Sequence, residues 1–347
     1  MISALIVGSG RIFYKHLKSL ELIGEKKIKI IGVCDLNPLK ENEIINKYKL
    51  KFFTNYKKAI SQTNPDVVII LTPSGLHAEH ILYSLKNKCH VIVEKPMCLK
   101  ISDAKNILNL SKKVKKRVFV VMQNKFNIPI LKLRKDIKSK KFGKLLHGSV
   151  IVRWMRDKKY YDQARWRGTW KYDGGVIANQ ASHHLDLMRT VMGEPISVYA
   201  QAAKHLAKIQ CEDTALILFK FKDNKTGIME ATTAMRPHNV EGSFSLMGAK
   251  GSAKIGGFAL NEITYYYTGK NFNKKKYRTK PKNVYGFGHL EFYKHFLYSL
   301  QENKKSEFEC EEAYKTVRLI NAIYKSIEKN KEIHISQFSN SKRLGID

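Results

Sequence analysis

The first 122 residues alternate short apolar runs with amphipathic stretches, and this alternation constrains the fold more than any other feature of the chain. Continuous apolar runs, such as residues 2–7 and 67–71, are typical of strands that helices cover on both faces. A helical pattern follows the second of these runs over residues 76–88. Strands and helices that alternate at this spacing predict βαβ units with right-handed crossovers. Residues 1–122 are therefore expected to form an α/β domain with a doubly wound parallel sheet.

The pattern changes after Gln123, where strands no longer alternate regularly with helices. A longer strand is expected at residues 144–155, followed by a loop rich in Tyr, Trp and Arg and by a helix at about 175–192. Strand-like runs separated by Asp, Asn and Gly turns then extend from 196 to 267. Residues 123–347 are therefore predicted to form a second, α+β domain with a large open, mostly antiparallel sheet.

The net charge of +33, from 63 Lys and Arg against 30 Asp and Glu, admits three interpretations. The chain could bind nucleic acid, attract an anionic small molecule, or carry a general bias toward lysine. Only 12 of the cations are arginine, and the densest stretch, residues 105–144, has no interleaved aromatic platform. We favour solvated lysine-rich surfaces, then attraction of an anionic substrate, and expect no specific nucleic-acid partner.

Other features of composition indicate a cytoplasmic protein. No apolar run approaches the roughly 20 residues of a membrane span, so no membrane partner is expected. The first strand begins at the N-terminus, which leaves no room for a signal peptide. The five cysteines are scattered without a CxxC motif, which argues against a disulfide framework and a zinc knuckle.

A glycine-rich turn stands where the first predicted strand meets the first helix. Gly8 allows a tight turn, and Gly10 lets the backbone approach a pyrophosphate at the helix N-terminus. Phe13 occupies the third fingerprint position, where Gly or Ala is usual. Asp35 ends the second strand, where a carboxylate can accept hydrogen bonds from ribose hydroxyls and repel a 2′-phosphate. The pattern predicts a Rossmann domain that binds NAD, with NADP less favoured.

Two further segments follow predicted strands at the same edge of the sheet, where ligands bind in doubly wound folds. Thr72, Pro73 and Ser74 follow one strand, and Glu94 and Lys95 end the next. A lysine at such a position can stabilise the oxygen of a hydroxyl as negative charge develops on it. The alternative is an ordinary surface lysine, which is plausible in so lysine-rich a chain.

A second group of polar residues lies on the helix predicted at 175–192. Asn179, His183 and Asp186 are spaced i, i+4 and i+7, so they are expected to share one face. A histidine there is a candidate general base. His184 points about 100° away, and periodicity leaves the choice between the two histidines open, as well as a purely structural role for both. No second cluster at ligand spacing is evident, so no metal is expected.

The loop before this helix combines aromatic and cationic side chains. Tyr160, Tyr161 and Trp170 surround Arg165 and Arg167 in the sequence. Aromatic faces pack on sugar rings, and arginine binds carboxylates and phosphates. The alternative is a packed surface loop without a ligand.

These motifs together resemble the Gfo/Idh/MocA family, the group of glucose-fructose oxidoreductase and inositol dehydrogenase. The segments that match in order and spacing, across roughly residues 1–300, are 8–12 with His16, 72–77, 94–96, 166–167, 174–175 and 179–186. The resemblance implies a Rossmann domain followed by an α+β domain whose open sheet often mediates oligomerisation. A homodimer or homotetramer through this sheet is therefore expected.

The resemblance also implies roles for individual residues. The lysine of the family's Glu-Lys-Pro motif contacts the nicotinamide ribose and the reacting hydroxyl, and the histidine of the helix motif is the acid/base, which corresponds to Lys95 and His183. Inositol dehydrogenase-like members have Asp where this chain has Asn179, which can orient a hydroxyl but cannot raise the histidine pKa by charge. Expected substrate contacts are Asn179, Asp186, Arg165, Lys125 and Tyr161. Expected cofactor contacts are Gly8, Gly10, Arg11, Ile12, Asp35, Thr72, Pro73, Ser74, His77, Glu94, Lys95, Gln123, Trp166 and Arg167.

Finer details resemble one branch of the family. Gln123 and Asn124, and the Asn-Gln variant of the helix motif, are similar to UDP-N-acetylglucosaminuronate 3-dehydrogenases of surface-polysaccharide pathways, although those usually have Arg where Lys125 stands. The expected activity is NAD-dependent oxidation of a ring hydroxyl, at C3 of an anionic nucleotide-linked sugar. The alternatives are an inositol or free-sugar dehydrogenase of carbohydrate catabolism and an NAD-binding regulatory protein.

Overall fold

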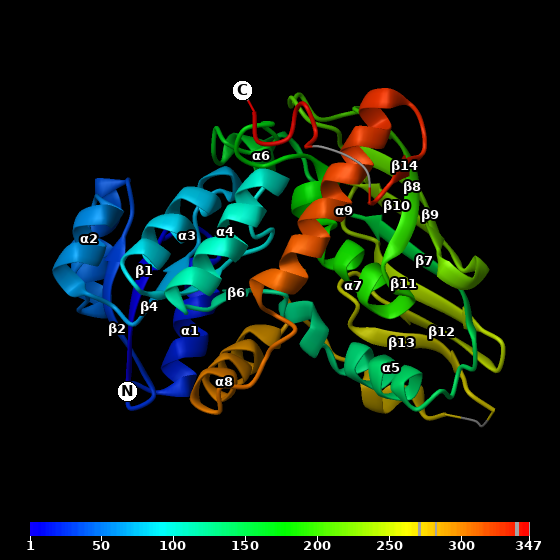
Figure 1. Cartoon of the computed structure of the whole chain (residues 1–347), viewed down its shortest axis with the longest axis horizontal. Coiled ribbons are helices and arrows are strands. Elements are labelled where there is room, and N and C mark those ends of the chain that lie inside the picture. Colours follow the sequence, from blue (N-terminus) through cyan, green and yellow to red (C-terminus); the bar gives the residue numbers. More distant parts are fainter. Residues whose placement is uncertain (270–271, 282, 337–339, 347) are drawn as a thin grey trace. The chain divides into compact units, whose positions relative to one another are not determined.

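The computed structural model describes residues 1–269, 272–281, 283–336 and 340–346, and it divides into two compact units (Figure 1). The first unit comprises Met1–Met122 and His289–Lys315. The second comprises Gln123–Gly288 and Thr316–Asp347.

A six-stranded parallel sheet forms the centre of the first unit, with strand order β3-β2-β1-β4-β5-β6. The strands are β1 (Ile2–Val7), β2 (Ile28–Cys34), β3 (Phe52–Phe53), β4 (Val67–Ile70), β5 (His90–Val93) and β6 (Val118–Val120). The order reverses between β1 and β4, where doubly wound sheets bind nucleotides. All four residues of β4 are fully buried, as the apolar run predicts. The predicted Rossmann sheet is confirmed.

Helices connect these parallel strands. They are α1 (Phe13–Ile23), α2 (Tyr56–Thr63), α3 (His77–Lys86) and α4 (Ile101–Val114) (Figure 1). Between β2 and β3 the chain forms a 3₁₀ turn at Pro38–Lys40 and a π-helical turn at Glu43–Lys47. The segment that follows β1 places the N-terminus of α1 beside the glycine-rich turn.

The chain returns to the first unit near its C-terminal end, through α8 (Gly288–Gln301) and the start of α9 (Cys310–Lys329). Phe119 of β6 packs edge-on against Phe296, with ring centroids 5.0 Å apart. Arg117 forms an ion pair with Glu309 at 2.7 Å. The sequence analysis placed all of 123–347 in the second domain, and residues 289–315 differ from that assignment. Periodicity shows that a helix has an apolar face, but not which core receives it.

An eight-stranded mixed sheet dominates the second unit, with order β13-β12-β11-β7-β10-β9-β8-β14. Only β10 and β7 pair in parallel; the other neighbours are antiparallel. The predicted large, mostly antiparallel sheet is confirmed. The strands are β7 (Leu145–Arg153), β8 (Pro195–Ala203), β9 (Thr214–Phe221), β10 (Thr226–Thr232), β11 (Glu241–Gly248), β12 (Gly251–Gly256), β13 (Glu262–Tyr267) and β14 (Ile333–His334).

The two faces of this sheet differ in exposure. The inner face carries buried residues such as Ile217, Phe219 and Met229, and α7 (Ser182–Met192) packs on it near Gly148, where an added Cβ would lie 2.9 Å from Met188 Sδ. The other helices of this unit include α5 (Ile128–Lys138) and α6 (Lys158–Asp162). The outer face, which we call the open face, exposes six large apolar or aromatic side chains by 40–54%: Leu216, Leu218, Ile228, Met247, Tyr265 and Tyr267.

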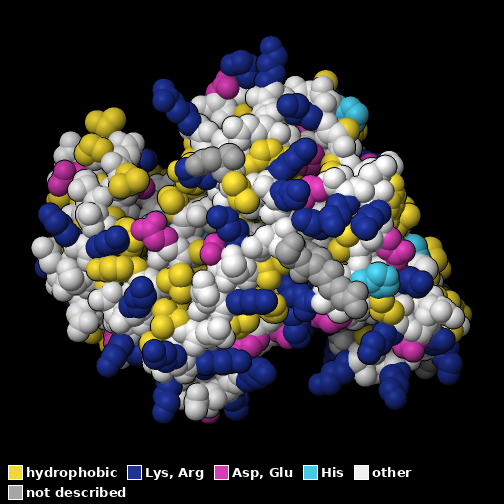
Figure 2. Space-filling model, turned by 45° about the horizontal axis from the view of Figure 1, so that its top comes forward, with side chains coloured by type: hydrophobic (Ala, Val, Ile, Leu, Met, Phe, Trp, Pro, Cys, Tyr) yellow, Lys and Arg dark blue, Asp and Glu magenta, His cyan; other side chains and the backbone are white. Residues whose placement is uncertain are grey.

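The cationic side chains are distributed over many helices, strands and loops. Figure 2 shows Lys and Arg dispersed over the visible face among apolar and uncharged groups, rather than gathered into one patch. Within the part of the chain that the structure describes, no helix combines the length and apolar composition needed to span a bilayer.

Candidate active site

The glycine-rich turn after β1 leaves room for a phosphate group beside the start of α1. Gly8 has φ +102°, and a Cβ there would lie 2.8 Å from the Leu71 carbonyl carbon, so only glycine fits the turn. Gly10 is exposed, and a Cβ there would have no neighbour within 4 Å. The backbone at Gly10 is therefore open to a ligand at the N-terminal end of α1, where the helix dipole favours an anion.

Asp35 lies directly after β2 and connects the second strand to this turn. Its Oδ2 accepts hydrogen bonds from Ser9 N at 2.6 Å and from Ser9 Oγ at 2.8 Å, and its Oδ1 accepts one from Asn37 N at 2.9 Å. A carboxylate has about four acceptor positions, so one remains for a ribose hydroxyl. The open backbone at Gly10 and the half-buried Asp35 carboxylate together fit a dinucleotide.

A buried histidine connects the segment that follows β4 with the segment that follows β5. The ring nitrogens of His77 lie 2.8 Å from the carbonyl oxygens of Pro96 and Thr72. Burial lowers the pKa of His77. Its side chain, only 1% exposed, therefore joins the two segments, while Thr72 and Pro73 remain half-buried at the edge. The expected cofactor contact of His77 stays a prediction, and the structure shows that its two ring nitrogens are used by backbone carbonyls.

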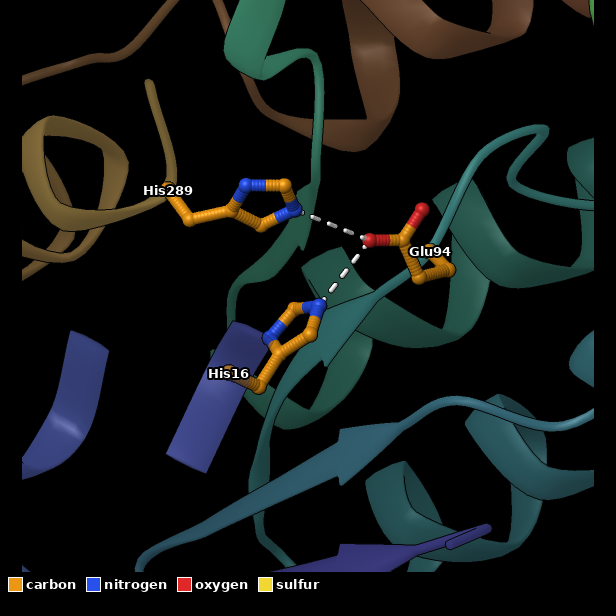
Figure 3. Close-up of side chains that lie close together, drawn as sticks. All are labelled: His16, Glu94 and His289. Atoms are coloured by element: carbon orange, nitrogen blue, oxygen red, sulfur yellow. Dashed lines mark hydrogen bonds and ion pairs between the residues drawn. The ribbon is translucent and has the colours of Figure 1, made fainter. Parts of the chain in front are cut away.

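Glu94 points into the first unit rather than toward solvent (Figure 3). Its Oε1 lies 2.9 Å from His16 Nε2 and 3.8 Å from His289 Nε2, and its Oε2 accepts a hydrogen bond from Lys95 N at 3.2 Å. The hydroxyl of Tyr293 lies 2.7 Å from His16 Nδ1. Burial acts to raise the pKa of Glu94, but the two histidines outweigh it and hold the pKa well below its ordinary value.

This buried His–Glu–His cluster fixes the end of β5 immediately before Lys95. The three side chains have donor types that also bind divalent metals, and their ligand atoms lie within 4.8 Å of one another. Sequence spacing offered no sign of it, because His16 and Glu94 are 78 residues apart and His289 lies on the returning segment. Glu94 was an expected cofactor contact, whereas its carboxylate is used inside the protein. Lys95 itself is half-buried.

The two candidate histidines of the second unit have opposite surroundings. His184 is fully buried, packs against Trp154 with ring centroids 5.6 Å apart, and has no hydrogen-bond partner on either nitrogen among the described residues. Burial lowers its pKa to about 4. His183 is the second residue of α7 and remains partly exposed. A base must reach its substrate, so this geometry favours His183.

The helix that carries these residues is interrupted. Asn179 lies in η5 (Val176–Gln180), a π-helical turn, and Ala181 separates this turn from α7 with φ −97° and ψ −1°. The expected continuous helix at 175–192 is therefore wrong, and Asn179 and Asp186 lie in separate helical segments, to which regular i, i+7 spacing does not apply. Asn179 Nδ2 donates to the carboxylate of Asp173, a partner that no sequence pattern indicated.

Asp186 lies in a buried ion cluster. Its carboxylate lies 2.9 Å from Lys125 Nζ and 3.2 Å from the Arg189 guanidinium, and it accepts a hydrogen bond from Thr316 at 2.8 Å. Burial acts to raise the pKa of Asp186, but Lys125 and Arg189 outweigh it and lower the pKa strongly. The sequence analysis expected Asp186 and Lys125 to contact substrate. The structure pairs them, at 3% and 5% exposure, inside the second unit.

The aromatic–cationic loop forms stacked pairs. The Arg167 guanidinium lies over Tyr160 and Trp166, at 4.3 and 4.7 Å from the ring centroids. Tyr161 lies 3.3 Å from the Thr233 hydroxyl, and Arg165 is exposed. Of the remaining expected contacts, Arg11 is exposed, Ile12 is half-buried at the start of α1, Ser74 is buried, and Gln123 is 3% exposed.

Glu212 is a buried acid beneath η5 that sequence reasoning missed. Its carboxylate accepts hydrogen bonds from Ile177 N at 3.1 Å and from the Tyr324 hydroxyl at 2.9 Å. A Cβ on Gly175 would lie 2.2 Å from this carboxyl group, so glycine is required there. Burial raises the pKa of Glu212 to about 7.

The stability of the protein is therefore expected to fall between pH 5 and pH 8. A raised folded-state pKa means that the folded protein holds this proton more tightly than the unfolded chain, whose ordinary value is 4.5. The contribution is fully present below about pH 4.5, and about 3 kcal/mol of it is lost as pH rises through about 7. Urea unfolding of Glu212→Gln should show a flatter pH dependence than wild type. Parallel curves for the two proteins would contradict the assignment, and Glu302→Gln serves as the exposed control.

The fold and these residues define a class, a dinucleotide-dependent oxidoreductase with a Rossmann unit and an α+β unit. Residues 2–122 match the oxidoreductase family with an NAD-binding Rossmann fold, GFO_IDH_MocA, and residues 130–254 match the GFO/IDH/MocA C-terminal domain. The chain belongs to this family.

Solved structures of two relatives cover nearly the whole chain. The WlbA dehydrogenase of Bordetella pertussis, in complex with NADH and UDP-GlcNAcA, is 31% identical with a TM-score of 0.92, over 96% of this chain and 97% of that one. The WlbA dehydrogenase of Chromobacterium violaceum, in complex with the same two ligands, is 33% identical with a TM-score of 0.89, over 96% and 95%. Myo-inositol 2-dehydrogenase of Thermotoga maritima is 23% identical over 96% of this chain and 98% of its own length.

Proposed function

We propose that the protein is an NAD-dependent dehydrogenase that oxidises a ring hydroxyl, at C3, of a nucleotide-linked sugar acid such as UDP-N-acetylglucosaminuronate. The observation that carries this proposal is the full-length similarity, above 30% identity, to two enzymes whose structures hold NADH and UDP-GlcNAcA. The chain also has a lysine two residues after β5 and a partly exposed histidine at the start of α7, which the reaction needs.

The chemistry divides between two side chains in this proposal. When bound, NAD supplies the acceptor for the hydride that leaves the sugar carbon. The Lys95 ammonium group stabilises the negative charge that develops on the hydroxyl oxygen, and the His183 imidazole accepts the hydroxyl proton. Asn179 can orient the hydroxyl but, being neutral, adds no charge to raise the basicity of His183. The products are a ketone, a protonated histidine and the reduced nicotinamide.

The direct test is oxidation of UDP-GlcNAcA by the purified protein with NAD, followed by NADH absorbance and by mass spectrometry of the ketone. We expect turnover with the sugar nucleotide and little with myo-inositol. Turnover of myo-inositol instead would support the second candidate, an inositol dehydrogenase, which the full-length match to the Thermotoga maritima enzyme favours. NAD binding without turnover of any sugar would indicate a regulatory protein.

Asp35→Ser is expected to relax the choice between the two nicotinamide cofactors. The carboxylate would repel a 2′-phosphate, so its removal should raise kcat/KM with NADP relative to NAD by about tenfold or more, equivalent to about 1.4 kcal/mol. Steady-state kinetics with both cofactors measure this ratio, with Asp103→Asn as a control acid elsewhere in the first unit. An unchanged ratio would show that Asp35 does not face the ribose.

We further propose that the open face of the second unit joins copies of the chain into a homodimer or homotetramer. Leu218 of β9 pairs in register with Ile228 of β10, and both are exposed, at 54% and 40%. Exposed apolar surface of this kind marks an interaction site.

Leu218→Lys should therefore shift the protein toward monomer. The introduced charge would have to be buried without a partner wherever two open faces meet. Light scattering after size-exclusion chromatography measures the mass of the assembly. Leu206→Lys, which adds a charge at an exposed leucine outside the sheet, should leave the mass unchanged. A wild-type monomer, or an unaltered Leu218→Lys oligomer, would refute the proposal.

A further inference from the structure

Three arginines from three segments of the second unit form a cluster beside the helix that carries His183. Arg156 follows β7, Arg167 follows α6, and Arg236 follows β10. The chain contains only 12 arginines, so this gathering is not explained by its bias toward lysine. We call these three residues the arginine cluster.

Aromatic rings hold two of the guanidinium groups in place. The Arg156 and Arg167 guanidinium carbons lie 5.1 and 4.3 Å from the ring centroid of Tyr160, and Arg156 also lies 5.4 Å from that of Trp154. Stacking of this kind orients a planar guanidinium. Arg156 also donates from Nε to Gln180 and from Nη1 to the Met155 carbonyl oxygen and to Asn239, so an anion would meet the remaining N–H groups of the cluster. Arg236 donates from Nη2 to the Arg156 carbonyl oxygen at 3.5 Å, which brings the third cation to the same place.

No acid among the described residues forms an ion pair with the cluster. Arg153, Arg189 and Arg278 each form ion pairs with acids, whereas none of the three cluster arginines does so among the described residues.

The acids near these arginines in sequence are engaged elsewhere. Asp162 pairs with Lys158, and Glu241 pairs with Arg153 and Lys254. Asp157 caps α6 through Tyr160 N, and Asp173 accepts hydrogen bonds from Gly168 N and Asn179. The Arg167 Nε atom is buried and has no hydrogen-bond partner in the described part of the chain. Cations fixed this close repel one another, and an oxyanion would relieve the repulsion and supply the missing acceptor.

The cluster is anchored to the segment that leads into α7. Gln180, the last residue of η5, accepts a hydrogen bond from Arg156 Nε at 3.1 Å and donates one to the Tyr160 hydroxyl at 2.9 Å. His183 lies only three residues further along the chain. An anion on the cluster would therefore belong to the same ligand whose hydroxyl reaches His183.

We propose that the arginine cluster binds the diphosphate of the nucleotide-sugar substrate. This inference rests on the proposed function and names the residues that recognise the charged part of its substrate. A diphosphate matches three cations better than a single carboxylate does, because it carries more charge and more acceptor oxygens for the guanidinium edges. Arg167 then serves the substrate, whereas the sequence analysis assigned it to the cofactor.

The test is calorimetric titration of the full-length protein, saturated with NADH, with UDP and separately with glucuronate, which has a carboxylate but no diphosphate. Arg156→Gln and Arg167→Gln should each raise the Kd for UDP at least tenfold and leave NADH affinity unchanged. Arg278→Gln, at an exposed arginine paired with Glu262, is the matched control and should bind UDP as wild type does. Arg236→Gln, at an exposed side chain, provides a further variant should loss of the Arg156 contacts unfold the protein.

Each outcome bears on the cluster independently of catalysis, because UDP binding needs no turnover. Unchanged UDP affinity in the variants, or absence of UDP binding by the wild-type protein, would overturn the inference even if a sugar is oxidised. Loss of NADH affinity instead of UDP affinity would assign the cluster to the cofactor, and loss of glucuronate binding alone would assign it to a carboxylate. UDP binding that depends on the cluster, in a protein that fails to oxidise UDP-GlcNAcA, would uphold the cluster and reject the proposed reaction.

Discussion

Lys95→Ala is expected to lower kcat by at least about 10²–10³-fold while NADH still binds with nearly wild-type affinity. The change removes the one positive charge that the proposed mechanism places on the developing alkoxide, and loss of a single such donor costs about this much in other enzymes. The backbone around it should survive, because Glu94 keeps its contacts with His16 and His289. Stopped-flow measurement of the chemical step and fluorescence titration of NADH separate the two effects.

Two comparisons make this prediction specific. Lys100→Ala removes a half-buried lysine shortly after the same strand end and should retain activity. Lys95→Arg keeps the charge but replaces a compact ammonium with a planar fork, so it should recover only part of the rate. A Lys95→Ala protein with wild-type kcat would remove Lys95 from the mechanism and leave the family assignment intact.

His183→Ala is expected to lower kcat/KM by about 10²–10⁴-fold, the usual contribution of a positioned general base. The remaining activity should depend less on pH, because the group that accepts the proton is gone. Binding of NADH and of UDP should change little, since neither is assigned to this side chain. Activity measured from pH 6 to pH 10, together with both titrations, tests all three expectations.

The neighbouring histidine supplies the decisive comparison. His184 is fully buried against Trp154, so His184→Ala should lower the free energy of unfolding while the folded fraction keeps its activity. Unfolding in urea and active-site titration distinguish loss of folded protein from loss of rate. A fully active His183→Ala together with an inactive but folded His184→Ala would reverse the assignment.

The buried contacts explain why the two catalytic candidates are held in place by different means. Lys95 follows a carboxylate that two histidines keep ionised in a dry interior. His183 follows a π-helical turn whose backbone is held by Glu212, through Ile177 N. Fixed supports of this kind are what a transition state needs, because charged groups that are already oriented need no rearrangement during the reaction.

Much of the fold could be predicted because local patterns carry it. Apolar runs long enough for one strand, interrupted by Gly and Pro, indicate buried parallel strands, and β4 is fully buried as expected. The Gly8 turn and Asp35 depend on a strand, a turn and a strand end that are close in sequence, so their positions at the strand ends could be predicted without coordinates. The same applies to the alternating exposure along β9.

Polar partners could not be predicted in this way. Periodicity placed Asp186 on a presumed ligand face, yet the structure pairs it with Lys125 and Arg189 in the interior. The π-helical turn η5 before α7 changes the angle between the residues that precede α7 and those within it. Hydrophobic periodicity does not predict where such a turn occurs. Glu212 was overlooked for a related reason, since an acid at the start of a strand is ordinarily exposed.

By itself, then, the sequence determined the alternating strands and helices of the first 122 residues, the turn that suits a dinucleotide and the family to which the motifs point. Tertiary structure alone decided which charges neutralise one another. It turned Glu94 and Asp186 inward and left His183 partly exposed while burying His184. It also gathered three arginines that have no ion-pair partner among the described residues. The physical reason is that backbone patterns act over a few residues, whereas burial and ion pairing depend on segments that meet only after the chain has folded.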